Sequence, residues 1–350
     1  MRLYICHTFY HVYISVLKEM VFQKQGGEAG DILLSTISTD FGRLDRRLEK
    51  SGLFRKVAFL PECHPRFFSE PFSGKLGTGN PLSKLLQRRR YFRYVVKNEE
   101  PYLRWDYEKY DDIYVFCDSD PIGYYLNAKH ISYISVEDGN NSGRYNSVIT
   151  ANESQFALKR FLAKRNYLFM QDGYSCYSRG YEVNCADGVI ADGRNVIENP
   201  TVGMVAQLGD ADKEKLYHIF RSWEQPMHSG GEEYVMILTQ PLCAEENRIA
   251  MYREIADCYA GQYKVIIKPH PIDKVDYAAE FPDCLVMPGD FPVEILNIYC
   301  DYRIQKAVTV YSTSMENLHF ADQKESLGLD ILDKYEDPAL HADLRRYEKS

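Results

Sequence analysis

Short apolar, β-branched runs alternate with stretches of helical spacing along most of this chain, and this alternation limits the fold most strongly. Strands are expected at residues 3–6, 31–35, 56–60, 112–117 and 131–136, and again at residues 234–239, 263–267, 284–287 and 307–310. Helical spacing separates several of them, as in residues 12–25 and 244–259. Such alternation is typical of βαβ units in a parallel, doubly wound sheet. We therefore expect an α/β fold.

The chain has 350 residues, which is enough for two domains of ordinary size. Between residues 152 and 201 the periodic pattern weakens, and several glycines and a proline interrupt it. We expect an N-terminal Rossmann-like domain over residues 1–155 and an irregular linker over residues 156–200. A C-terminal Rossmann-like domain should follow over residues 201–350, with a helix that begins at residues 312–314 and a charged terminal helix over residues 327–348.

Charge and cysteine usage exclude several classes of protein. The net charge is -8 and the pI is about 5.7, whereas general nucleic-acid binding needs a basic surface. The nine cysteines are scattered and no pair has CxxC spacing, which argues against a zinc site or a disulfide framework. No apolar run is long enough to span a bilayer. These features favour a cytoplasmic protein with reduced thiols.

One predicted helix, over residues 82–97, is basic and partly amphipathic. Its cations extend from Lys84 to Lys97 and are interleaved with leucines and aromatic residues. Such a helix can simply present a solvated face. It can also rest on an anionic membrane, which for this chain would mean peripheral contact with the inner face of the cytoplasmic membrane.

The stretch Tyr263–Pro271 combines a buried strand with a stiff turn. Residues 263–267 are apolar and β-branched, and Pro269 and Pro271 then bracket His270. Each proline fixes its own φ and disfavours helical geometry in the residue before it, so the strand must stop at Lys268. Ligands of open α/β sheets bind at the carboxyl ends of strands. His270 is therefore a candidate ligand, although a strand exit that merely contains a histidine has the same pattern.

Two further strand ends carry reactive groups, Glu137-Asp138-Gly139 and Ser312-Thr313-Ser314. A carboxylate can remove the proton of a sugar hydroxyl, and a histidine can donate to a departing phosphate. Hydroxyls and backbone N–H groups at a helix N-terminus bind phosphate. The triplet Asp118-Ser-Asp120 matches a metal-binding DxD pattern, but three-residue acidic patterns are frequent by chance, and we expect no metal site.

In this order, the Glu-Asp-Gly, His-Pro and Ser-Thr-Ser motifs resemble those of the bacterial sialyltransferases. The Lys-Pro-His-Pro form and the N-terminal strand with its Tyr-containing turn resemble most the lipooligosaccharide and capsule sialyltransferases of glycosyltransferase family 52. The resemblance implies a GT-B architecture, with two Rossmann-like domains facing each other across a cleft. It implies inverting, metal-independent transfer from CMP-sialic acid to a terminal galactose-type hydroxyl of a bacterial surface glycan. No cofactor is implied besides this donor substrate.

The resemblance also implies roles for individual residues. Asp138 would be the catalytic base, and His270 would contact the CMP phosphate. The donor side would further include Lys268, Pro271, Glu294, Ser312, Thr313 and Ser314, and the acceptor side Gly139, Tyr10 and His11.

Several alternatives stay open at this point. Glu245 or Glu246, in a loop that ends another strand, could supply the base in place of Asp138. The same fold could use another nucleotide sugar, or it could serve a non-catalytic capsule-assembly protein that keeps a nucleotide-binding cleft. The sequence also leaves open whether the chain forms a homodimer, which acceptor it uses and which linkage it makes.

Overall fold

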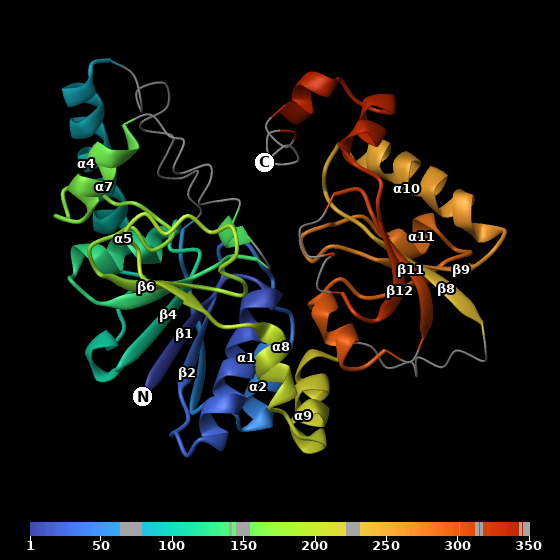
Figure 1. The fold of residues 1–350 in the computed structure, drawn as a ribbon, viewed down its shortest axis with the longest axis horizontal. Coiled ribbons are helices and arrows are strands. Elements are labelled where there is room, and N and C mark those ends of the chain that lie inside the picture. Colours follow the sequence, from blue (N-terminus) through green and yellow to red (C-terminus); the bar gives the residue numbers. More distant parts are fainter. Residues whose placement is uncertain are drawn as a thin grey trace. The chain divides into compact units, whose positions relative to one another are not determined.

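A computed structural model describes residues 1–63, 79–139, 142–144, 155–221, 232–300, 302–311, 315, 318–342 and 345. The chain divides into two compact units, residues 1–212 (unit 1) and residues 213–350 (unit 2), and each is described by itself. Each unit has a parallel sheet with helices connecting its strands (Figure 1). The predicted α/β class with two parallel sheets is confirmed.

Unit 1 contains a seven-stranded sheet in the order β3-β2-β1-β4-β5-β6-β7, and all of its strand pairs are parallel. Its strands are β1 (Arg2–Cys6), β2 (Asp31–Ser35), β3 (Lys56–Leu60), β4 (Asp112–Phe116), β5 (Tyr133–Val136), β6 (Ser178–Val183) and β7 (Val196–Glu198). The strand order reverses between β1 and β4. Ligands of doubly wound folds bind outside the carboxyl ends of the strands at such a switch point.

The helices of unit 1 connect these strands. They are α1 (Phe9–Lys24), α2 (Leu44–Ser51), α4 (Pro81–Glu99), α5 (Pro121–Ala128), α7 (Phe156–Ala163) and α8 (Thr201–Ala206), with a 3₁₀ turn η2 (Tyr107–Lys109). Every residue of β1 and β2 is buried. Strands covered on both faces are mostly apolar, as at residues 3–6 and 32–34, which explains why these runs do not alternate with polar residues. A further helix, α9 (Asp210–Phe220), begins at the boundary between the units.

Unit 2 contains a five-stranded parallel sheet in the order β10-β9-β8-β11-β12, and its switch point lies between β8 and β11. Its strands are β8 (Glu233–Leu238), β9 (Lys264–Lys268), β10 (Leu285–Val286), β11 (Arg303–Thr309) and β12 (Ala321–Ser326). Its helices are α10 (Glu245–Ala260) and α11 (Tyr277–Glu280), with 3₁₀ segments η3 (Val293–Asn297), η5 (Leu329–Lys334) and η6 (Pro338–His341). Met251, Tyr252 and Ile255 of α10 pack into one core with Val235 and Ile267.

The region predicted as an irregular linker, residues 156–200, is part of the unit 1 fold. It forms α7, β6 and β7, and the two strands extend the sheet beyond β5. The glycines that interrupt the periodicity there have local structural reasons. At Gly180 a Cβ atom would lie 2.7 Å from Cδ1 of Ile197, so the absence of a side chain lets β7 approach β6. The boundary between the units follows Asp212 instead.

Unit 2 differs from expectation near its C-terminus. We expected a helix to begin at residues 312–314, which lie outside the described residues, and a second helix over residues 327–348. The structure instead has β12, a polar strand that is an edge of the described sheet and pairs with β11, and then the 3₁₀ segments η5 and η6. An edge strand can leave most of its side chains in water, so β12 lacks the apolar signal of a buried strand.

Candidate active site

Polar side chains gather at the carboxyl edge of the unit 1 sheet, around its switch point. His7 follows β1, Cys117 follows β4, and Asp138 lies two residues beyond β5. Glu62, two residues beyond β3, reaches the same place through a hydrogen bond with His7. Because parallel strands present their carboxyl ends at one edge, distant segments of the chain meet there.

His11 joins this edge from the first turn of α1. Thr8 caps the helix: its hydroxyl accepts from the backbone N–H of His11, while Nδ1 of His11 accepts from the backbone N–H groups of Thr8, at 3.2 Å, and His7, at 3.0 Å. A backbone N–H can only donate, so Nδ1 carries no proton and the neutral ring holds its proton on Nε2. Burial lowers the pKa of His11 despite the neighbouring carboxylate of Asp138, which also favours the neutral ring.

Asp138 accepts a hydrogen bond from this ring. Nε2 of His11 lies 2.9 Å from Oδ1 of Asp138 and 2.7 Å from its backbone oxygen, and the Cys117 thiol donates to Oδ1 at 2.7 Å. The side chain is nevertheless 57% exposed. Both side-chain hydrogen bonds go to Oδ1, so Oδ2 is the oxygen that could accept a proton from a substrate.

Electrostatics keep Asp138 ionised. Desolvation by the surrounding protein would raise its pKa, but the hydrogen bonds from His11 and Cys117 outweigh this and hold the pKa well below its ordinary value. The thiol of Cys117 has a pKa well above its usual value because of burial and the neighbouring carboxylate of Asp138. Cys117 therefore acts as a neutral donor, and Asp138 is a carboxylate anchored through one oxygen.

A buried histidine–carboxylate pair, which the sequence did not reveal, supports this edge. Nε2 of His7 lies 2.8 Å from Oε2 of Glu62, and Oε1 of Glu62 accepts from the backbone N–H of Ile122, at 2.9 Å, in the first turn of α5. Burial opposes the charging of His7, but the carboxylate of Glu62 outweighs it and raises the pKa of the imidazole. The available signal was that His7 directly follows a predicted apolar strand and that Cys117 ends another.

His7, His11 and Cys117 also need to be considered as metal ligands, because one ligand atom from each lies within 4.8 Å of the others. Their hydrogen bonds do not fit this role. Nδ1 of His11 is occupied by backbone donors and Nε2 carries the proton, so neither nitrogen offers a lone pair. A metal-bound cysteine is a thiolate, whereas the pKa of Cys117 is raised. The donor set suits hydrogen bonding to a carboxylate.

The two acids of the DxD-like triplet have distinct environments. Asp118 is buried and accepts from the hydroxyl of Tyr133 at 3.1 Å and from the backbone N–H of Asp172 at 2.7 Å. Asp120 precedes α5, and one of its oxygens lies 3.6 Å from Nε2 of His7. Burial raises the pKa of Asp120 to about 6. Asp118 thus fixes the loop around residue 172 and has no oxygen directed at solvent.

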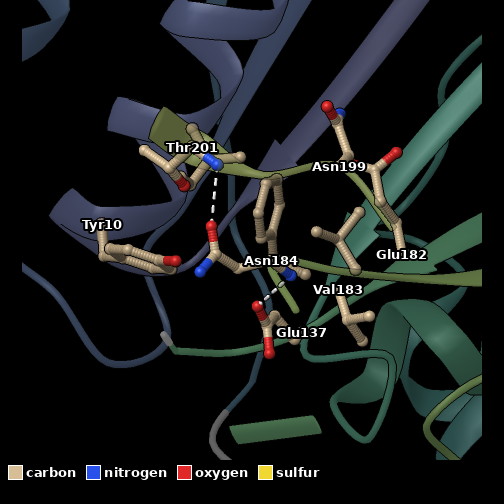
Figure 2. Close-up of a pocket in the computed structure, with 10 residues that line it drawn as sticks. Tyr10, Glu137, Glu182, Val183, Asn184, Asn199 and Thr201 are labelled. Carbon is tan, nitrogen blue, oxygen red and sulfur yellow. Dashed lines mark hydrogen bonds between the residues drawn. The ribbon is translucent and has the colours of Figure 1, made fainter. Parts of the chain in front are cut away.

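The residue before Asp138 has a structural role. Glu137 is buried, and its carboxylate accepts from the backbone N–H groups of Asn184, at 2.6 Å, and Gly143, at 3.1 Å. Asn184 in turn accepts from the backbone N–H of Thr201 at 2.7 Å, and Figure 2 shows this bond and the one from Asn184 to Glu137 beside Tyr10. The cavity here is about 10 Å³, room for one water molecule and not for a sugar. Glu137 therefore ties β5 to the segments after β6.

In unit 2 the proline-bracketed turn lies where the sequence predicts it, at the end of β9. The backbone N–H of His270 donates to Oγ1 of Thr239 at 3.3 Å, and its carbonyl accepts from Asp273 at 2.9 Å. Nδ1 of His270 accepts from the backbone N–H of Ile272 at 3.3 Å, which leaves the proton on Nε2. Burial and the charge of Lys268 lower the pKa of His270 to about 4. His270 is thus a neutral donor at neutral pH.

Lys268, the last residue of β9, and Glu294, in η3, carry opposite charges near this turn. The ammonium of Lys268 is buried, donates to the carbonyls of Pro269, at 2.9 Å, and Gly289, at 3.3 Å, and lies 4.3 Å from the ring centroid of Phe291. Burial lowers the pKa of Lys268 to about 7 and raises the pKa of Glu294, while their opposite charges act against both shifts. These contacts join the turn to the segment that leads into η3.

The alternative bases and the Ser-Thr-Ser motif complete the predicted site residues of unit 2. Glu245 and Glu246 open α10 and are exposed, so either carboxylate is accessible to a substrate. Ser312, Thr313 and Ser314 lie outside the described residues.

A residue that we did not single out, Gln240, lies at the unit 2 switch point, where its Oε1 accepts from the backbone N–H of Tyr311 at 3.0 Å. This bond directs its amide NH₂ away from Tyr311.

Comparisons with known proteins agree with this architecture. Residues 210–327 match the sequence profile of Glycosyltransferase family 52, a segment that lies almost wholly in unit 2. An uncharacterized protein of Haemophilus influenzae is 35% identical over 89 residues, which cover 24% of this chain and 28% of that protein.

The comparison with solved structures found chains similar to this one. The GT-B domain of a sialyltransferase from Photobacterium damselae has a TM-score of 0.51 at 11% identity, over 91% of this chain and 87% of that one. The glycosyltransferase SnogD from Streptomyces nogalater has a TM-score of 0.48 at 13% identity, over 99% and 94% of the two chains. Residues 210–327 are thus similar to glycosyltransferase family 52, and the two parallel-sheet α/β units have the GT-B fold.

Proposed function

We propose that this glycosyltransferase moves sialic acid from CMP-sialic acid to a hydroxyl of a terminal galactose-type sugar on a bacterial surface glycan. The observation that carries the proposal is the neutral His270 donor, held on a rigid turn inside the segment that matches family 52. The similar solved domain from Photobacterium damselae also belongs to a sialyltransferase, which supports the choice of donor.

The proposed reaction needs one base and one donor to the leaving group. Oδ2 of Asp138 takes the proton of the acceptor hydroxyl, whose oxygen attacks the anomeric carbon with inversion. The bond from that carbon to the phosphate oxygen breaks, and CMP leaves with new negative charge on its phosphate. The Nε2–H of His270 stabilises this charge by a hydrogen bond. Because the ring is neutral, it is a weak acid and keeps its proton while CMP leaves.

The other donor-side residues would shape the nucleotide site. Lys268, whose charge Glu294 partly offsets, donates to a carbonyl in the turn and to one in the segment that leads into η3. Pro271 fixes the exit of the turn, so that His270 keeps one orientation. We further propose that Ser312, Thr313 and Ser314 contact the phosphate, and that Tyr10 and Gly139 adjoin the acceptor. A reducing, cytoplasmic location agrees with the nine free cysteines.

A coupled assay of CMP release over a small panel of acceptors tests the function. Release from CMP-sialic acid that depends on a galactose-terminated acceptor is the expected result. Titration calorimetry with CMP and UDP supplies a readout that does not need the right acceptor: tighter binding of UDP would contradict the proposed donor. Binding of CMP without turnover on any acceptor would instead favour a non-catalytic role in capsule assembly.

A further inference from the structure

Two helices of unit 1, α4 and α7, form a continuous surface that the proposed reaction does not use. Leu85 of α4 packs against a small core cluster that includes Ala163, Leu168 and Tyr174, and α4 and α7 lie side by side in Figure 1. The guanidinium of Arg89 lies 5.5 Å from the ring centroid of Tyr167, which connects the exposed sides of the two segments. We call residues 81–99 and 156–167 the α4–α7 surface.

The α4–α7 surface is strongly basic, although the whole chain carries a net charge of -8. Its only acidic residue is Glu99, which is buried. Its cations are Lys84, Arg88, Arg89, Arg90, Arg93, Lys97, Lys159, Arg160, Lys164 and Arg165. Most of them are exposed, while Arg160 forms an ion pair with Asp192. Such a local excess of positive charge attracts an anionic partner.

Exposed apolar side chains lie among these cations. Leu82, Leu86 and Phe161 are 66%, 50% and 51% exposed. Leu82 and Leu86 share one helical face with Arg89, Arg93 and Lys97, following the spacing i, i+4, i+7, i+11 and i+15.

The second helix repeats this pattern. Leu158 and Phe161 follow the spacing i, i+3 on α7, Leu158 is 51% exposed, and Arg165 lies two residues beyond the end of the helix. The guanidinium of Arg165 lies 3.6 Å from the centroid of the Phe161 ring. The surface thus exposes leucine and aromatic side chains directly beside cationic groups.

We propose that the α4–α7 surface docks unit 1 on an anionic lipid bilayer. Cations alone would bind any polyanion. The exposed leucine and phenylalanine side chains beside them are stabilised only in an apolar phase, which the boundary between lipid headgroups and acyl chains provides. Long basic side chains reach the phosphates above that boundary. No helix among the described residues is long and apolar enough to cross a membrane. The binding therefore lies in the plane of the interface.

Cosedimentation with vesicles tests this inference independently of activity. The full chain should bind vesicles of phosphatidylcholine and phosphatidylglycerol, bind vesicles of phosphatidylcholine alone far less, and detach as salt rises. The charge-reversed variant Arg88→Glu/Arg89→Glu/Arg90→Glu should lose about 100-fold or more in partitioning. Arg43→Glu/Arg46→Glu/Lys50→Glu changes the same charge at exposed positions in and next to α2 and should bind like the wild type.

A second pair of variants separates lipid from other polyanions. Leu86→Ser/Phe161→Ser should weaken vesicle binding, whereas Val202→Ser/Leu340→Ser, which changes exposed residues elsewhere, should not. Unchanged thermal midpoints show that each variant is folded. Equal vesicle binding by the wild type and the Arg88–Arg90 variant overturns the inference. So does binding of soluble polyphosphate as tight as vesicle binding, with no effect of the Leu86 and Phe161 changes.

Discussion

Oδ1 of Asp138 lies 2.9 Å from Nε2 of His11, and Nδ1 of the same ring accepts from the backbone at the start of α1. One buried side chain therefore connects the cap of a helix with an exposed carboxylate at the end of β5. The direction of each hydrogen bond follows from the backbone donors, which cannot accept. The backbone around His11 therefore fixes the tautomer of its neutral ring, with the proton on Nε2.

The identity of the base is the first prediction. Asp138→Asn should lower the rate of transfer by about 10²–10⁴-fold, because the amide cannot take the acceptor proton. CMP affinity should stay unchanged, because Asp138 belongs to unit 1 and the family 52 segment lies almost wholly in unit 2. Glu245→Gln and Glu246→Gln serve as matched controls. Near-normal transfer by the Asp138 variant, together with loss in either control, would move the base to unit 2.

A pair of substitutions at His11 tests its role in positioning Asp138. His11→Gln keeps a donor near the place of Nε2 but loses the acceptor at Nδ1, and His11→Asn does the reverse. The hydrogen bond from His11 lowers the pKa of Asp138, so its loss in the Asn variant should move the acid limb of the pH–rate profile to higher pH. The Gln variant should keep that limb and lose about 0.5–2 kcal/mol of stability with the cap.

Equal pH profiles for the two His11 variants would contradict this division of roles. Denaturation in urea and rates measured across acidic pH supply both readouts. A residue with a purely structural role would change stability without moving the acid limb.

His270 should act through a hydrogen bond and not by donating its proton. Burial lowers its pKa to about 4, so the ring is already neutral from about pH 5.5 upward, and its titration should not shape the rate there. His270→Gln, which keeps an N–H donor, should retain more activity than His270→Ala, which should lose about 10²–10⁴-fold and bind CMP more weakly. Equal loss in both variants, with a wild-type rate that falls as pH rises through about 6.5, would indicate a true proton donor.

The buried ammonium of Lys268 should give stability a distinct pH dependence. Burial lowers its pKa to about 7, whereas unfolded lysine titrates near about 10.4. Between these values the unfolded chain binds a proton that the folded chain does not, so this residue makes stability rise with pH by up to about 1.4 kcal/mol per unit. Below the folded-state pKa of about 7, both states hold the proton, so the destabilisation by the buried ammonium no longer changes with pH.

Urea denaturation of the wild type and Lys268→Met between pH 7 and about 9 isolates this effect, because other titrating groups are common to both proteins. The wild type should gain stability relative to the variant as pH rises. A difference in stability that stays constant over this range would show that the ammonium keeps an ordinary pKa.

Activity should survive a strong chelator. Nδ1 of His11 accepts from backbone donors and its Nε2 donates to Asp138, and Asp118 is engaged with Tyr133 and Asp172. These residues therefore offer a divalent ion few lone pairs. Transfer measured in EDTA should match the untreated rate. Inhibition that manganese reverses would revive the DxD interpretation.

The sequence predicted the individual strands and turns better than the contacts between segments that lie far apart in the chain. Most strands of both sheets, the stop of β9 at Lys268 and the turn around His270 follow from apolar runs and proline stereochemistry, which are local. The contact of His11 with Asp138 spans 127 residues and depends on the order of strands in the sheet, which periodicity does not define. The same holds for His7 and Glu62, which are 55 residues apart.

Other features were missed because their local signal is weak or misleading. The polar edge strand β12 has no apolar run, and β6 contains a glycine that the pattern marks as a break. Cys117 adopts a φ of 54°, a left-handed conformation uncommon for residues other than glycine, and no composition rule predicts it. That backbone turn lets the thiol donate to Asp138.

The double use of the His11 ring also restricts how this protein can change over evolutionary time. Most stability determinants of an enzyme can drift and be compensated at distant positions, because their contributions are roughly additive. At position 11 a replacement that restores the helix cap loses the donor to Asp138, and one that restores the donor loses the cap. No single other side chain presents an acceptor and a donor at these two places with the rigidity of a planar ring. Compensation would require the helix start and the β5 end to change together.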